Sequence, residues 1–292
     1  MKKLLFIINP KAGKKKTKDY VERAIAVFNK AGYKVGTKYT RKRADATEFA
    51  KTMAGKVDLV VCMGGDGTLN EVIEGMLEEG IDTPLGYIPA GSTNDFATSL
   101  GLCSDPEKQA EFIISHEPRY LDMGCFNGRY FVYTASAGIF TRTSYTTSQK
   151  LKNRLGHFAY ILAGAKEIFH IKKMPLVIET DGEKIVGNYI FAAINNATKV
   201  GGIMKIDEHI VKFNDGVFEL LLIKSPRGLF SLINTIYKLI KQRFDGSITL
   251  MHVKEVTITN CGGIDWSLDG EKEEGKEKVE FKVISNAIRF IY

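Results

Sequence analysis

The chain lacks the features that define several large protein classes. Its 292 residues contain no apolar run of about eighteen residues, the length that a membrane-spanning helix needs. The four cysteines lie far apart and form no C-x-x-C pair, which favours reduced thiols in a cytoplasm over a disulfide or zinc framework. No basic run carries interleaved aromatics of the kind that stacks bases, so a nucleic-acid partner is not expected.

Positive charge and apolar residues are what the chain has in quantity. The net charge is +7 and 44% of the residues are hydrophobic, which is enough for a sizeable core and for two domains. A basic protein without a nucleic-acid motif favours a nucleotide or an anionic lipid as its partner. Residues 1–10 resemble a signal peptide, but the apolar run is too short and no cleavage site follows, so they predict a first buried strand.

Residues 59–77 contain the strongest local pattern. An apolar run at 59–61 predicts a buried strand, and apolar residues at helical spacing predict a helix over 68–77. Gly64, Gly65 and Gly67 lie between them. Glycine lets a ligand approach the main chain, and the free N–H groups of a helix start attract an anion. The pattern therefore predicts a phosphate site.

Asp66 stands among these glycines. A carboxylate repels phosphate unless a cation, a hydroxyl or a proton lies between them, so we interpret Asp66 as a partner of Mg2+, of water or of part of a nucleotide. The alternative is a helix cap in a tight turn, which would not require three glycines.

Two further turns follow predicted strands. Residues 9–16 combine an Asn-Pro turn with lysines after a strand at 4–8, and the alternative there is a solvated basic loop. Residues 90–97 place Ser, Thr, Asn and Asp at a helix start after a strand at 83–89, where a single cap would need only one of them. Both turns follow strands, where open α/β sheets bind ligands.

The chain changes character near residue 122. Strands and helices alternate up to about residue 120, which predicts a parallel, doubly wound sheet. Beyond it we expect antiparallel strands, in a sandwich or barrel, with hairpin turns at 127–128 and 181–182. These strands are 119–126, 129–137, 175–180, 184–195, 217–223, 248–259 and 278–285.

Two helices are expected within this second half, at 155–171 and 228–244. The second has a basic polar side, so it either covers its own sheet or lies on an anionic membrane. Near the end, Asp269 and Glu271 flank a glycine turn, and such pairs are usually solvated.

Four motifs together resemble the diacylglycerol kinase catalytic family, and within it the soluble bacterial lipid kinases. They are residues 9–13 (NPKAG), 64–72 (GGDGTLNEV), 89–97 (PAGSTNDFA) and 268–271 (LDGE). The resemblance implies an N-terminal doubly wound nucleotide-binding α/β domain, residues 1–122 with 286–292 returning to it. It also implies a C-terminal antiparallel β-sandwich domain, residues 123–285, and an active site in the cleft between the two.

The resemblance further implies roles for the matching positions. Lys14 would lie against the phosphates, and Glu271 matches the family's proposed general base, although Asp269 is also open for that role. The acidic network around the catalytic Mg2+ would comprise Asp66, Asp95, Asp122 and Asp269. ATP would be held by Asn9, Pro10, Lys11, Ala12, Gly13, Thr40, Gly64, Gly65, Asp66, Gly67, Thr68, Leu69, Asn70 and Thr93. A structural Mg2+ would involve Asp215 and the carbonyls of Lys212 and Val217.

The implied activity is an ATP- and Mg2+-dependent kinase that phosphorylates a lipid hydroxyl, with diacylglycerol and phosphatidic acid as the first choice of substrate and product. We expect a cytoplasmic protein that works at the anionic inner face of the membrane, as a monomer or a homodimer. The alternatives are a soluble-substrate kinase of the NAD kinase or phosphofructokinase type, and a non-catalytic nucleotide- or lipid-binding regulator.

Overall fold

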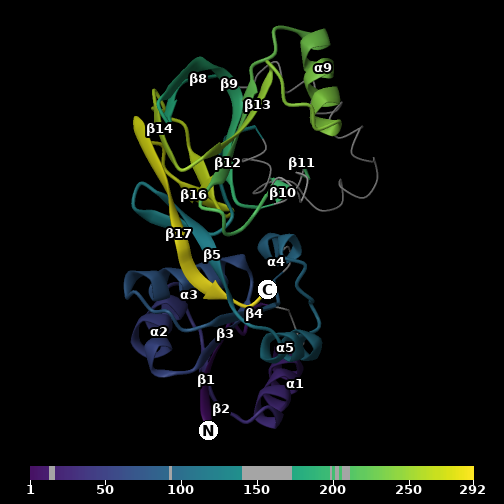
Figure 1. The fold of residues 1–292 in the computed structure, drawn as a ribbon, viewed down its shortest axis with the longest axis vertical. Helices are drawn as coiled ribbons and strands as arrows, with labels where there is room; N and C mark the ends of the chain where they lie inside the picture. The colour runs from purple at the N-terminus through teal and green to yellow at the C-terminus, as the bar shows by residue number, and fades with distance from the viewer. Residues whose placement is uncertain (13–16, 92–93, 140–172, 198, 201–203, 206–210) are drawn as a thin grey trace. The chain divides into compact units, whose positions relative to one another are not determined.

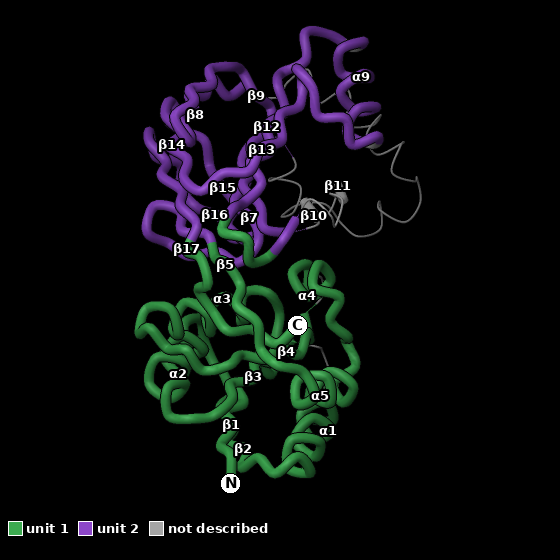
Figure 2. The backbone as a smooth tube through the Cα atoms, viewed as in Figure 1, with its two compact units in different colours: residues 1–123, 213–216, 284–292 green, residues 124–212, 217–283 purple. Residues whose placement is uncertain are grey.

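The computed structural model divides into two compact units. It describes residues 1–12, 17–91, 94–139, 173–197, 199–200, 204–205 and 211–292. Unit 1 comprises Met1–Met123, Phe213–Gly216 and Ile284–Tyr292, and unit 2 comprises Gly124–Lys212 and Val217–Val283 (Figure 2). The division expected from the sequence did not include 213–216 in the first part.

Unit 1 alternates strands and helices. Its elements are β1 (Lys2–Ile8), α1 (Thr17–Lys30), β2 (Tyr33–Tyr39), α2 (Asp45–Met53), the short 3-10 helix η2 (Ala54–Lys56), β3 (Leu59–Gly64), α3 (Asp66–Glu78), β4 (Leu85–Pro89), α4 (Asp95–Ser99) and α5 (Pro106–Ser115). The end of β17 (Lys278–Phe290), which begins in unit 2, pairs with β4.

The sheet of unit 1 is parallel, in the order β17-β4-β3-β1-β2. Figure 1 shows the helix pairs α1–α5 and α2–α3 on opposite faces of this sheet. Helices on both faces explain why all six residues of β3 are buried. The chain runs outward from β1 to β2 and then returns to β1's other side with β3, so the topological switch point lies between β1 and β3.

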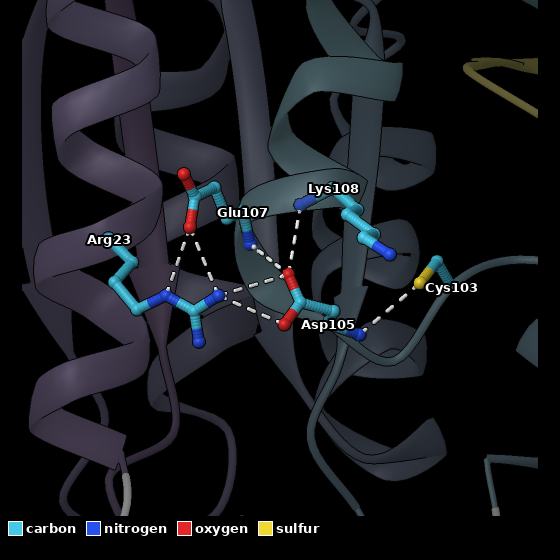
Figure 3. A network of polar contacts seen from close by, with 5 residues as sticks. All are labelled: Arg23, Cys103, Asp105, Glu107 and Lys108. Carbon is cyan, nitrogen blue, oxygen red and sulfur yellow. Dashed lines mark hydrogen bonds and ion pairs between the residues drawn. The ribbon is translucent and has the colours of Figure 1, made fainter.

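A polar network holds α1 to α5 (Figure 3). Asp105 caps α5 by accepting hydrogen bonds from the backbone N–H groups of Glu107 and Lys108, both at 3.1 Å. Arg23 of α1 donates to both Asp105 oxygens, at 3.2 and 3.0 Å, and forms an ion pair with Glu107. These bonds, that of Lys108 first, lower the pKa of Asp105 and keep its carboxylate charged.

Unit 2 is an antiparallel β domain. Its elements are β6 (Arg129–Phe131), β7 (Thr134–Gly138), β8 (Met174–Thr180), β9 (Glu183–Asn195), β10 (Lys199–Val200), β11 (Met204–Lys205), β12 (Phe218–Lys224), α9 (Leu229–Ile240), β13 (Ile248–Val253), β14 (Glu255–Thr259), β15 (Trp266–Leu268) and β16 (Glu271–Glu273). β5 (Arg119–Phe126) enters it from unit 1.

The long strand β9 organises unit 2, because it pairs with β8, β7 and β12. Buried side chains of these strands and of β6, β14, β15 and β17 form one core, in which the rings of Phe131, Phe218 and Phe281 lie 5.5–5.8 Å apart. The α/β plus β-sandwich fold class predicted from the sequence is confirmed.

The two expected hairpins are also confirmed. Asn127 and Gly128 both have positive φ (50° and 85°) between the paired strands β5 and β6. Asp181 and Gly182 do the same (45° and 83°) between β8 and β9. Two successive residues at positive φ are the signature of the type I′ turn that Asn-Gly and Asp-Gly favour.

Three predictions about unit 2 were wrong in detail. The expected strand 129–137 is two strands, because residues 132 and 133 leave the ladder. The expected strand 248–259 breaks at Lys254, because β13 pairs with β12 whereas β14 pairs with β17 and β8. The helix expected at 228–244 ends at Ile240. The helix expected at 155–171 lies outside the described residues.

Candidate functional site

The ends of β1 and β3 meet at the switch point and are tied together by Asn9. The Asn9 backbone N–H donates to the carbonyl of Met63, 2.8 Å away. Its side-chain Nδ2 donates to Oγ1 of Thr68 at 2.9 Å, and its Oδ1 accepts the backbone N–H of Lys11 at 3.0 Å. One side chain therefore fixes the Asn-Pro turn against the first turn of α3. Thr40, directly after β2, is buried, and its backbone N–H donates to the carbonyl of Ile8 at the end of β1.

The turns after β3 and β4 are in close contact. The Gly64 carbonyl accepts the backbone N–H groups of Ala90 and Gly91, at 2.7 and 3.2 Å. A Cβ on Gly91 would lie 2.7 Å from Cα of Gly65, nearer than real Cβ atoms come. Glycine at position 91 is therefore required for the two turns to approach each other.

The Tyr87 side chain contacts both turns, and the sequence analysis did not predict this. Its hydroxyl donates to the Gly64 carbonyl at 3.1 Å and lies 3.4 Å from Oδ1 of Asn94, which also accepts the Gly91 N–H. Burial, and then the charge of Asp66, raises the pKa of Tyr87 far above its usual value, so the phenol stays a donor. No sequence signal separates this tyrosine from an ordinary core residue of β4.

Asp66 and Asp95 are brought together within unit 1. They are the first residues of α3 and α4, and Oδ2 of Asp66 accepts the backbone N–H of Asp95 at 3.1 Å. Both side chains are half-buried. Carboxylate oxygens are the ligands that Mg2+ prefers, so the donor chemistry here fits that ion.

The other expected nucleotide contacts differ in exposure. Leu69 is buried in α3 and contributes to packing, whereas Gly67 is exposed at the start of the helix. Pro10 and Lys11 are exposed after β1. Ala12 and Asn70 are half-buried. Three expected site residues lie outside the described part of the chain: Gly13, Lys14 and Thr93.

Asp122 has an architectural position in unit 1. It is 1% exposed, and its two oxygens accept the backbone N–H groups of Asn286 and Gly216, both at 2.7 Å. Its own N–H donates to the carbonyl of Phe213 at 2.8 Å. A single carboxylate thus joins β5, the 213–216 segment and β17, a role that sequence reasoning did not anticipate.

The residues expected around a structural Mg2+ form no described cluster. Lys212 and Asp215 are exposed, and Asp215 is the only carboxylate in 211–217. Among the described residues, no group of three or more His, Cys, Asp or Glu side chains is arranged to hold a metal ion. The assignment of Lys212, Asp215 and Val217 to a metal stays a prediction.

Asp269 is anchored in unit 2 by three backbone hydrogen bonds. Asp269 and Gly270 form the positive-φ turn (48° and 91°) between β15 and β16. Oδ2 of Asp269 accepts the backbone N–H of Val132 at 2.6 Å, and Oδ1 accepts those of Tyr133 and Thr134 at 3.0 and 2.9 Å. These bonds explain why 132 and 133 leave the ladder, and why Asp269 is buried and not solvated.

Glu271 is held by an arginine. Oε2 of Glu271 accepts from Nη2 of Arg129 at 2.6 Å, while Nη1 of the same guanidinium donates to Glu273 at 2.7 Å. Burial lowers the pKa of Arg129, but the bonds to Glu273 and Glu271 outweigh it and raise the pKa overall. Arg129 was missed by the sequence analysis, because its partners lie more than 140 residues away.

The expected acidic residues therefore fall into two groups. Asp66, Asp95 and Asp122 belong to unit 1, whereas Asp269 and Glu271 belong to unit 2. Within unit 1 the structure joins Asp66 to Asp95, and it gives Asp122 backbone partners of its own.

Two family models match the chain in succession. The diacylglycerol kinase catalytic domain matches residues 3–126, and the YegS C-terminal NAD kinase beta sandwich-like domain matches residues 134–292. The first match contains the turns after β1, β3 and β4, and the second contains the Asp269–Glu271 hairpin.

Curated relatives and a solved structure agree with these models. A diacylglycerol kinase of Bacillus subtilis is 36% identical over 226 residues, 77% of this chain and 74% of the relative. One of Staphylococcus aureus is 32% identical over 272 residues, 92% of this chain and 86% of the relative. A crystal structure assigned to a diacylglycerol kinase of Bacillus anthracis has TM-score 0.83 at 24% identity, covering 100% of this chain and 97% of that one, which shows the shared fold.

Proposed function

The chain belongs to the diacylglycerol kinase catalytic domain family and is a lipid kinase, and from that premise we propose that it transfers the γ-phosphate of ATP to the hydroxyl of diacylglycerol, giving phosphatidic acid. The observation that carries the proposal is that the turns after β1 and β4 both hydrogen-bond to the end of β3, at Met63 and Gly64, while the Asp66 carboxylate accepts the backbone N–H of Asp95. This arrangement supports the proposal, because it brings backbone N–H groups suited to phosphate and two aspartates together in unit 1.

Unit 1 would bind the nucleotide. The start of α3 presents backbone N–H groups and the positive end of a helix dipole, which favour phosphate. Asn9 hydrogen-bonds to Thr68 and so orients the start of the neighbouring turn before ATP binds. Preformed binding groups spend no free energy on ordering when the substrate binds. Lys14 and Thr93 complete the expected set as proposals from the family motifs.

Asp66 and Asp95 would hold Mg2+. When bound, Mg2+ supplies positive charge that offsets the developing negative charge on the transferring phosphoryl group. The role of the two aspartates is to supply oxygen ligands from neighbouring helix starts. The bond from the Asp95 N–H to Asp66 fixes the orientation of that carboxylate.

Glu271 is our choice for the general base. Both Asp269 oxygens accept buried backbone N–H groups, an arrangement suited to holding the hairpin in place. Glu271 is partly exposed, with 40% of its side chain accessible, and one guanidinium orients it. A positioned, accessible carboxylate can take the proton of a lipid hydroxyl as it attacks phosphorus.

The acceptor would be met at a membrane. A net charge of +7 favours an anionic surface, and we assign the protein to the cytoplasm, peripheral to the inner face of the membrane, where its four free cysteines stay reduced. No helix in the described part of the chain is long and apolar enough to cross a membrane.

The test is ATP consumption with Mg2+ against diacylglycerol, phosphatidylglycerol, a polyprenol and a sphingoid base in mixed micelles, with NAD and a sugar phosphate assayed without micelles. We expect diacylglycerol to be phosphorylated fastest. Turnover of a soluble acceptor alone would replace the proposal with a soluble-substrate kinase, and ATP binding without any transfer would support a regulator.

A further inference from the structure

The helix α9 exposes an apolar stripe to solvent. Phe230 is 89% exposed, Ile233 55% and Tyr237 50%. Their spacing of three and four residues places them on one face of the helix. The other face is buried through Leu232 and Thr235, 5% and 3% exposed. Exposed large apolar side chains are few among the described residues, and the grouping of three on one helix indicates a binding surface.

The charge around this stripe is mostly positive. Residues 220–244 contain five cations and no acidic residue: Lys224, Arg227, Lys238, Lys241 and Arg243. Asp245, directly after this segment, forms an ion pair with Lys238. Arg227 and Lys241 are exposed and lie at the two ends of α9. Lys241 follows Phe230 by eleven residues, which is three helical turns, so it continues the same stripe. The surface therefore combines apolar side chains with exposed cations at both ends.

We propose that the apolar stripe of α9, with Arg227 and Lys241, inserts into the headgroup region of an anionic bilayer and places the enzyme on the membrane. An amphipathic helix with aromatic and aliphatic side chains beside basic residues is suited to that interface. The inference rests on the proposed function, because a lipid substrate resides in that bilayer.

A second copy of this chain is a poorer occupant. A twofold contact that paired α9 with α9 would bring together two stripes whose ends both carry cations. Such a contact would oppose like charges across the interface, which costs affinity. Anionic headgroups neutralise the same charges, and juxtamembrane basic residues gain binding free energy from them.

The experiment is cosedimentation of the full chain with vesicles of phosphatidylglycerol and phosphatidylcholine in equal parts, and with phosphatidylcholine alone. The double variant Phe230→Ser/Ile233→Ser should lower the vesicle–water partition coefficient about tenfold, because the variant has less apolar surface to transfer from water into the bilayer. Val186→Ser is the matched control, since Val186 is also an exposed apolar residue of unit 2, 68% exposed on β9. It should bind like the wild type.

The charge component is tested separately. Arg227→Gln/Lys241→Gln should weaken binding to the anionic vesicles about thirtyfold and reduce the difference from phosphatidylcholine vesicles. The control is Lys254→Gln/Lys282→Gln, which removes two exposed cations of unit 2 from other elements. Thermal unfolding of every variant should match the wild type, because all seven substituted positions are exposed on the surface.

The outcomes separate this inference from the proposed function. With a short-chain diacylglycerol dispersed as monomers, the α9 variants should keep the wild-type rate, and a silent wild type would refute the kinase proposal alone. Unchanged vesicle binding in the α9 variants, equal losses in the control variants, or no wild-type binding to anionic vesicles would overturn the inference. So would dissociation of a dimer by Phe230→Ser/Ile233→Ser with vesicle binding intact.

Discussion

Glu271 and Glu273 form a matched pair that separates catalysis from structure. Each accepts one hydrogen bond from the same guanidinium of Arg129, at 2.6 and 2.7 Å, and the three side chains are between 20% and 40% exposed. An ion pair of this exposure contributes about 0.2–1 kcal/mol to stability. Glu→Gln at either position keeps an oxygen acceptor for Arg129. Each change should therefore lower the free energy of unfolding by less than about 1 kcal/mol.

The two variants should differ in turnover. Glu271→Gln removes the proposed base and should lower kcat by about 10²–10⁴, the usual contribution of a positioned proton acceptor. Glu273→Gln removes a charge of the same ion pair and should change kcat by less than about twofold. The assay is lipid phosphorylation in micelles with saturating ATP, beside urea unfolding of each variant. Equal losses of kcat in the two variants would show that the ion pair with Arg129 matters and not a proton acceptor at Glu271. Full activity of Glu271→Gln would refute the assignment of the base.

Three further predictions concern the anchors of the fold. Asp269→Ala should lower the free energy of unfolding of unit 2 by about 3 kcal/mol or more in a denaturant titration, because three buried N–H groups lose their acceptor; an unchanged midpoint would contradict this. Gly91→Ala should lower the free energy of unfolding by about 1–3 kcal/mol, because the new Cβ would lie 2.7 Å from Cα of Gly65. Gly65→Ala is the control: its Cβ would lie at an ordinary 3.5 Å from Cα of Gly91, so the free energy of unfolding should change by less than about 0.5 kcal/mol. The lowered pKa of Asp105 means that its charged form stabilises the native state above its ordinary pKa of 3.8 and that this stabilisation is lost as pH falls further. Asp105→Asn should therefore show a smaller drop in unfolding temperature between about pH 6 and pH 3 than the wild type, and equal drops would refute the linkage.

Local patterns explain what could be predicted from the sequence. The Asn127-Gly128 and Asp181-Gly182 turns depend on two adjacent residues at positive φ, so each hairpin can be predicted from a dipeptide in the sequence. The buried strand β3 and the helix α3 follow from apolar spacing, and the glycines between them predicted the turn. These features need no knowledge of distant residues.

Contacts over long separations explain what could not be predicted. The break at residues 132–133 depends on Asp269, which follows them by more than 130 residues. Nothing in the local sequence around Asp122 indicates its partners, yet its carboxylate oxygens accept the backbone N–H groups of Gly216 and Asn286. No local pattern specifies which backbone N–H groups a carboxylate will meet after folding.

The central claim is that the strand ends of unit 1 deliver the γ-phosphate of ATP to a lipid hydroxyl with the help of Asp66. The most direct measurement is transfer of label from γ-labelled ATP into phosphatidic acid, with Mg2+ and diacylglycerol micelles, for the wild type, Asp66→Asn and the control Asp105→Asn. Asp66→Asn keeps an oxygen acceptor for the Asp95 N–H but loses the charge. The account predicts labelled lipid from the wild type and the control, and at least about a hundredfold less from Asp66→Asn. Equal labelling by all three proteins would contradict it.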